Sequence, residues 1–246
     1  MKINIGLQIY TVREELSLGY DEVFRKVAEA GYKGVELPYA PEHGAEIKEL
    51  LAKHSLEAVG SHISAEDIES NLEEVKSFAD FIGSKIIIIP WIGGDSVESY
   101  EKTKETAKRF EAIAQKLSAM GYELAFHNHR LEFERKFDGK TVMDIFFEEA
   151  PTLKFQIDAG WAYAAGADVC AFLNKFAERL ISIHIKDVDE NDTPTEIGSG
   201  KVDMKSVIDT AAGLGVKWGV VEQDNCINYK PFESIKVSYN YLKTIH

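Results

Sequence analysis

Short apolar segments alternate with longer amphipathic segments along the whole chain. The four consecutive isoleucines at 86–89 suit a buried strand, because such a strand is covered on both faces. The longer segments carry apolar residues at helical spacing, as at Val23, Phe24 and Val27, and glycines often follow them. We expect strands at 3–8, 34–37, 56–62, 85–89, 122–126, 153–158, 180–185 and 217–222, and helices at 20–30, 45–53, 65–82, 97–120, 141–149, 169–176, 203–214 and 232–242.

This order of elements predicts a single α/β domain over residues 1–246. The strand–helix units recur every 30 residues or so, roughly the length of a βαβ unit, and eight of them close into a (β/α)8 TIM barrel. The rival is an open, doubly wound sheet, which usually has a glycine-rich phosphate loop after an early strand. Ile9-Tyr10-Thr11 follows the first strand instead, so the barrel is favoured.

Composition and charge narrow the class of partner. The chain has 246 residues and a formal net charge of −13, which disfavours binding to nucleic acid or to an anionic membrane. Two cysteines do not make a disulfide framework, and we find neither a signal peptide pattern nor an apolar run that could span a bilayer. We therefore expect a cytoplasmic protein with a small-molecule partner.

Side chains that bind metals or transfer protons stand at the ends of six predicted strands. In a parallel barrel these ends converge on one face, where active sites lie. The residues are Glu36, His62, His127 (with His129 and Glu132 close behind), Asp158, His184 and Glu222.

Asp158, His184 and Glu222 end the sixth, seventh and eighth strands, so they should be close in space. Two carboxylates and an imidazole suit Mn²⁺, Co²⁺, Zn²⁺, Mg²⁺ or Fe²⁺. Each residue also has an ordinary structural explanation, as a helix cap or a core histidine. Their coincidence on three adjacent strands favours one divalent metal ion.

The fourth ligand should come from the fifth strand or the loop that follows it. His127, His129 and Glu132 are the candidates, and strand alternation puts the two histidines on one face. Glu132 would help to neutralise the metal and could act as a base, although a solvated loop acid would look the same in the sequence.

Other residues at the same face could bind a substrate. Glu36 and His62 would donate or accept hydrogen bonds to hydroxyl groups, or they could be structural. Lys186 shares the strand face of His184 and could bind an anion or move a proton, although a salt bridge to a nearby aspartate is also open. Trp161 could stack on a sugar ring, or it could simply pack.

At these residues the chain resembles the xylose isomerase-like barrel superfamily, and within it the sugar phosphate isomerase/epimerase group. The resemblance covers nearly the whole length. It lies in the segments 34–37, 61–62, 126–133, 157–161, 184–187, 198–203 and 221–224.

The resemblance implies a divalent metal, commonly Mn²⁺, held by residues of the fifth to eighth strands. By this resemblance, the metal ligands from the sixth, seventh and eighth strands are Asp158, His184 and Glu222. The first place is a glutamate in many epimerases, and here the only glutamate nearby is Glu132, so we expect it to complete the metal shell. The segment from His127 to His129 departs from that pattern and also resembles inosose dehydratase-like branches. DNA-repair endonucleases belong to the superfamily too, but the charge of −13 argues against them.

The expected function is a metal-dependent isomerase or epimerase of a small sugar, keto-sugar or polyol-derived ketone. Glu222 or Glu132 would remove the proton beside the carbonyl, and the other, or His62, would return it. One alternative is a dehydratase or lyase of a keto-sugar or inosose-like compound, with Lys186 or a histidine as the acid. Another alternative is a sugar-binding barrel without catalysis. In the isomerase or epimerase and in the dehydratase or lyase alike, the substrate would contact His127, His129 and Trp161. Homo-oligomers are common among the proteins that this chain resembles.

Overall fold

Eight parallel strands form a closed barrel in the computed structural model, which describes residues 2–246. The order around the barrel is β1-β12-β9-β8-β5-β4-β3-β2. The strands span Asn4–Gln8 (β1), Gly34–Pro38 (β2), Glu57–His62 (β3), Ile86–Ile89 (β4), Glu123–His127 (β5), Lys154–Asp158 (β8), Leu180–Ile185 (β9) and Trp218–Val221 (β12). The predicted α/β barrel is confirmed, and every predicted strand lies within two residues of its observed bounds.

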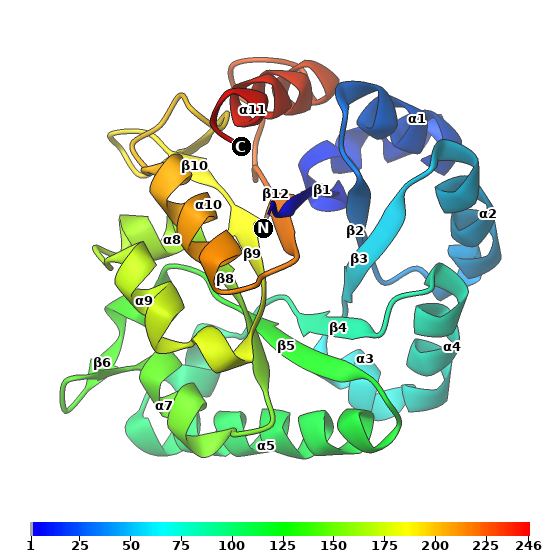
Figure 1. Cartoon of the computed structure of the whole chain (residues 1–246). Coiled ribbons are helices and arrows are strands. Elements are labelled where there is room, and N and C mark those ends of the chain that lie inside the picture. The colour runs from blue at the N-terminus through cyan, green and yellow to red at the C-terminus, as the bar shows by residue number, and fades with distance from the viewer. Residues whose placement is uncertain (1) are drawn as a thin grey trace.

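Helices surround the strands on the outside of the barrel (Figure 1). The α-helices span Tyr20–Ala30 (α1), Gly44–His54 (α2), Ala65–Ser70 (α3), Leu72–Ile82 (α4), Tyr100–Ala119 (α5), Leu131–Glu134 (α6), Val142–Glu149 (α7), Ala159–Ala164 (α8), Val169–Lys175 (α9), Met204–Gly213 (α10) and Pro231–Ile245 (α11). Short 3-10 helices span Ile9–Leu18 (η1), Pro41–His43 (η2), Gly94–Val97 (η3) and Ala177–Arg179 (η4).

A backbone break and a side-chain cap correct two of the expected helix boundaries. The predicted helix at 65–82 is divided into α3 and α4 at Asn71, whose backbone leaves the helical region at φ −133° and ψ 39°. The predicted helix at 97–120 begins only at Tyr100, because the Ser99 side chain accepts a hydrogen bond from Lys102 N and caps the helix.

Aromatic packing joins the helical layer to the barrel. Phe126 of β5 stacks on Phe146 of α7, with ring centroids 5.1 Å apart, and Phe110 of α5 meets both rings edge-on. All three side chains are buried. Such contacts fix the outer face of β5, and alternation then turns Ala125 and His127 to the inner face.

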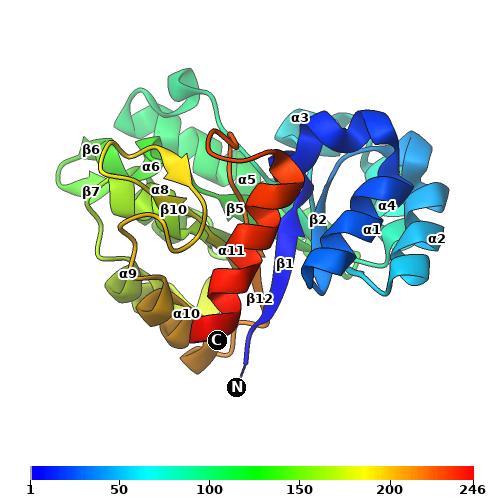
Figure 2. The same ribbon diagram turned by 90° about the horizontal axis from the view of Figure 1, so that it is seen from above.

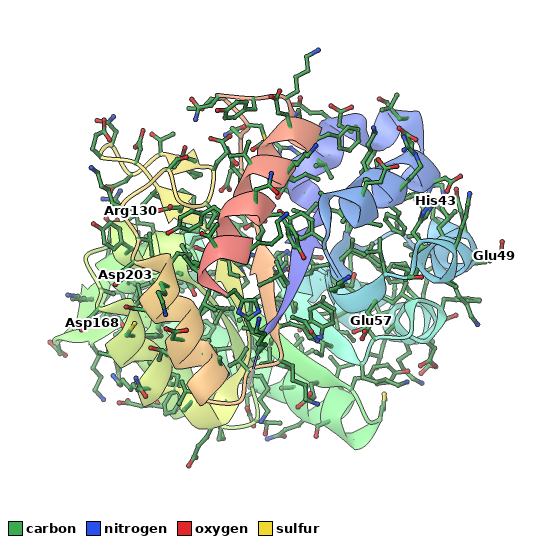
Figure 3. All side chains as sticks on the ribbon, turned by 45° about the horizontal axis from the view of Figure 1, so that its top comes forward. His43, Glu49, Glu57, Arg130, Asp168 and Asp203 are labelled. Carbon is green, nitrogen blue, oxygen red and sulfur yellow. The ribbon has the colours of Figure 1, made fainter. Side chains whose placement is uncertain are left out.

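The loops after the strands carry small elements of their own. The loop after β5 contains α6 and a hairpin of β6 (Lys136–Phe137) and β7 (Lys140–Thr141), and the loop after β9 contains a hairpin of β10 (Asp187–Val188) and β11 (Pro194–Thr195). Figure 2 shows β1 leading away from the N-terminus toward the end of the barrel where the loop before α11 also lies. His43, to which we assign no role, lies at the outer edge of the helical ring (Figure 3). Within residues 2–246, no helix combines the length and apolar character that a membrane crossing needs.

Candidate active site and metal centre

Four donor side chains meet at the strand ends. His127, Asp158, His184 and Glu222 each offer a ligand atom, and these atoms all lie within 4.8 Å of one another. Register explains the convergence, because Asp158 pairs directly with His184 and Val220 pairs with His184 on its other side. Glu222 follows two residues after Val220, so alternation turns it to the same interior.

Glu36 lies beneath these donors and joins them to the floor of the site. Its Oε1 accepts a hydrogen bond from Gln8 Nε2 at 2.7 Å and lies 2.7 Å from His184 Nε2 and 2.9 Å from His62 Nε2. Its Oε2 accepts one from Gln156 Nε2 at 2.6 Å. The side chain is 0% exposed and does not line the pocket described below. Protein donors therefore occupy both carboxylate oxygens, which places Glu36 behind His184 rather than against a substrate.

Charges in this buried cluster shift the pKa values strongly. Burial lowers the pKa of His184, but the carboxylates of Glu36 and Glu222 outweigh burial and raise it to about 10. Burial raises the pKa of Glu36, but His62 and His184 hold it well below its usual range. In the protein without metal, His184 is therefore a buried cation between two carboxylates.

Lys186 points into the same cluster. Its Nζ lies 2.9 Å from Glu222 Oε2, 3.1 Å from Asp158 Oδ2 and 2.9 Å from Asp224 Oδ2, and the side chain is 0% exposed. The Trp161 ring lies 4.8 Å from the same ammonium group. Of the roles considered for Lys186, the structure shows a salt bridge, but to these three carboxylates rather than to Asp187 or Asp189.

The fifth strand contributes His127 to the donor group, and Glu132 is not part of it among the described residues. Glu132 lies in α6, buried, and its Oε2 accepts a hydrogen bond from His129 N at 2.8 Å. Burial raises its pKa. The reason is local: β5 ends at His127, the chain turns, and Glu132 closes that turn instead of reaching the metal site. Asn128 points to the other side and accepts a hydrogen bond from Asp158 N.

A pocket of about 440 Å³ opens above the donors. Of the predicted site residues, His62, His127, His129 and Glu222 line it. The other predicted substrate or catalytic residues do not line the pocket; these are Glu36, Glu132, Trp161 and Lys186. Lys186 still contacts the pocket-lining Glu222 through its ammonium group. Trp91, which like Trp161 follows a predicted strand end, is 62% exposed and gives the pocket an aromatic face.

Several lining residues were not identified from the sequence. Tyr10 and Arg13 come from the loop after β1, where the guanidinium lies 4.0 Å from the Tyr10 ring centroid. Asp224 lies two residues beyond Glu222. In an extended segment this spacing turns both side chains to the same side, so it could have identified Asp224 as a lining residue. Gln156 does not line the pocket, but it contacts Glu36, His62 and His127. It could have been found, because it precedes Asp158 by two residues on a strand and so faces the interior.

The donor set fits a divalent metal ion. Two imidazoles and two carboxylates at one point are a common ligand set, and Asp158 Oδ2 is buried without a hydrogen bond. The Glu36–His184 pair is the type of carboxylate–histidine contact that orients a metal-bound imidazole. This cluster could therefore hold a metal ion.

The fold and the donors at its strand ends define an α/β barrel with an enzyme-like site. The chain belongs to the xylose isomerase-like TIM barrel family, whose profile matches residues 24–244.

Named relatives share the barrel over nearly its whole length. An inosose dehydratase of Mesomycoplasma hyopneumoniae is 25% identical, and the match covers 98% of this chain and 86% of that protein. The crystal structure of a sugar phosphate isomerase/epimerase from Parabacteroides distasonis superposes with a TM-score of 0.83 at 20% identity, covering 99% and 94% of the two chains. The structure of the 3-keto-D-glucoside 4-epimerase of E. coli superposes with a TM-score of 0.75 at 16% identity, and the match covers 99% of this chain and 100% of that chain. These two structural matches show the shared fold.

Proposed function

We propose that this protein is a metal-dependent lyase that dehydrates a cyclic keto-polyol or keto-sugar. One observation carries the proposal. The carboxylates that line the pocket, Glu222 and Asp224, both follow β12, whereas His62, His127 and His129 line the pocket from β3 and β5. A carboxylate base on one side with histidines elsewhere suits elimination, which removes one proton and gives another to the leaving hydroxyl.

In this proposal Glu222 takes the proton from the carbon beside the carbonyl. His62 gives a proton to the hydroxyl on the next carbon as the C–O bond breaks, so the products are water and an unsaturated ketone. A divalent metal held by His127, Asp158, His184 and Glu222 would polarise the carbonyl and stabilise the charge of the enediolate. His129 has a buried Nδ1 without a hydrogen bond, so it could bind a substrate hydroxyl.

The metal we propose is Mn²⁺, with Zn²⁺, Co²⁺ and Fe²⁺ as alternatives. The two carboxylates suit Mn²⁺, and the two imidazole donors suit Zn²⁺ and Fe²⁺ better than Mg²⁺. The dehydratase name of the M. hyopneumoniae relative supports the same reaction class.

An epimerase is the second candidate, because His62 lines the pocket and could return the proton to the opposite face of the same carbon. The E. coli structural neighbour carries an epimerase name. The difference from the lyase is only which atom receives the second proton.

One experiment separates the candidates. We would incubate the Mn²⁺-loaded protein in D₂O with inososes, ketohexoses and 3-ketoglucosides, and follow the products by NMR and mass spectrometry. Loss of water with a new enone or dione absorbance supports the lyase. Deuterium beside the carbonyl without loss of water supports epimerisation or isomerisation. Binding without exchange of any compound would leave a non-catalytic sugar-binding barrel and refute both enzyme proposals.

Metal binding should release a proton. Because the pKa of His184 is raised to about 10 without metal, its imidazole is protonated at pH 7.5 and must lose that proton to become a ligand. We expect about one proton to be released per metal bound, and the apparent affinity to rise as the pH rises toward 10. Calorimetric titration with Mn²⁺ in buffers of different ionisation enthalpy measures this number. An enthalpy independent of the buffer would contradict His184 as a ligand.

A further inference from the structure

Lys186 contacts two metal donors and one carboxylate that is not a donor. Asp158 and Glu222 belong to the four-donor group, whereas Asp224 does not. The three oxygens lie between 2.9 and 3.1 Å from the ammonium nitrogen. Without the ammonium, Asp158 and Glu222 would keep only the imidazole of His184 beside them, at 3.8 and 3.1 Å, and incompletely paired buried charges are costly.

A metal ion and this ammonium draw on the same two carboxylates. At Asp158 they compete for one oxygen, Oδ2, because Oδ1 already accepts a hydrogen bond from Trp161 N. A divalent ion would bond the Asp158 and Glu222 oxygens at about 2.0–2.2 Å. An ammonium group that stayed at 3 Å from both oxygens would then lie close to a doubly positive ion, and this repulsion is strong in a buried site. The ammonium must therefore move when metal binds.

The surroundings of Lys186 restrict that movement to the end of the side chain. A Cβ added at Gly160 would lie 2.7 Å from Lys186 Cγ and 2.9 Å from its Cβ, so the base of the side chain is tightly packed. Apart from the donors, the terminal nitrogen contacts the carboxylate of Asp224 and lies 4.8 Å from the Trp161 ring centroid. The Asp224 side chain is 27% exposed and lines the pocket, and its contacting oxygen has no hydrogen bond.

We propose that Lys186 is the resident cation of the metal-free site, and that Asp224 holds its ammonium group when a metal ion binds Asp158 and Glu222. Both are positioning residues in this role. Lys186 keeps the donor carboxylates together before the metal binds. Asp224 lowers the energetic cost of moving the ammonium group away from them. The inference rests on the metal site of the proposed function.

The first test measures stability with and without metal. We expect Lys186→Met to lower the melting temperature by roughly 6–12 °C in the presence of a chelator, because two buried carboxylates lose their ammonium partner. In saturating Mn²⁺ most of this loss should disappear, because the metal replaces the ammonium. Equal losses with and without Mn²⁺, or no loss in the chelator, would overturn the role of resident cation.

The second test is a double-mutant cycle on Mn²⁺ affinity, measured by competition with a chelating dye. Asp224→Asn should weaken binding by about tenfold in the wild-type background, because the displaced ammonium loses its anchor. In the Lys186→Met background the same change should matter less than about threefold, and Lys186→Met alone should strengthen binding. Asp209→Asn, an equal loss of charge on the exposed face of α10, is the control.

The outcomes distinguish failure of the Lys186–Asp224 inference from failure of the proposed metal site. If Asp224→Asn weakens binding equally in both backgrounds, Asp224 acts only through its charge and the anchor role is refuted. If the wild-type protein binds no Mn²⁺ at all, the metal site itself is refuted and this inference falls with it.

Discussion

Glu222→Gln should abolish turnover and leave the fold intact. In the proposed function Glu222 is a metal ligand and also the base that lines the pocket, so the amide removes both functions. We expect kcat to fall by about 10³-fold or more, the usual size of a lost general base together with a lost metal contact. The far-UV circular dichroism spectrum should not change, because the two side chains have nearly the same shape.

Metal content then separates the two roles of Glu222. A variant that retains Mn²⁺ but exchanges no substrate proton has lost the base, whereas one that no longer holds Mn²⁺ has lost a ligand. Glu190→Gln, an exposed glutamate in the loop after β9, is the matched control and should retain full activity. Turnover by the Glu222 variant within tenfold of the wild-type protein would show that the catalytic assignment is wrong.

The fold could be predicted from the sequence because each strand is a separate apolar segment between clear stops. The strand ends also carry the chemistry, and the register of a parallel barrel then decides which side chains meet. Asp158, His184 and Glu222 could be grouped for this reason, since the strands that carry them are neighbours both in the chain and in the barrel.

The fifth strand could not be resolved in the same way. His127 and Glu132 are both reasonable ligands in the sequence, and the choice depends on where β5 stops. The strand ends at His127, and the turn into α6 points Glu132 at the backbone of His129. A turn that bends the chain within a few residues leaves no periodic pattern, so alternation predicts nothing beyond it.

The sequence also did not show how deeply each side chain lies within the barrel. Glu36 lies two residues before the end of β2 and is fully buried under the donors, whereas Glu222 directly follows the end of β12 and lines the pocket. The predicted strands, 34–37 and 217–222, place both side chains near a strand end, and where a strand stops depends on tertiary pairing as well as on local sequence. The face of Lys186 could be predicted, but its ion-pair partners could not, because Asp158 and Asp224 come from other strands.

Glu36→Gln should both destabilise the protein and weaken its metal site. Glu36 receives hydrogen bonds from Gln8 and Gln156, and it contacts His184 and His62. A glutamine would place an amide NH₂ against one of these donors and would leave the cationic His184 without its nearest anion. Removing one member of a buried charged pair costs about 3–5 kcal/mol of unfolding free energy.

The same substitution should reduce Mn²⁺ affinity by about 10–100-fold, because the carboxylate no longer orients the imidazole of His184 or raises its basicity. The matched control is Glu57→Gln, at the exposed start of the adjacent strand β3, which should change neither quantity (Figure 3). Urea unfolding in a chelator gives the stability change, and dye competition gives the affinity. If the Glu36 variant lost stability but bound Mn²⁺ as tightly as the wild-type protein, Glu36 would be a structural acid of the barrel floor, and the His184 imidazole would be oriented by its other contact, Glu222, alone.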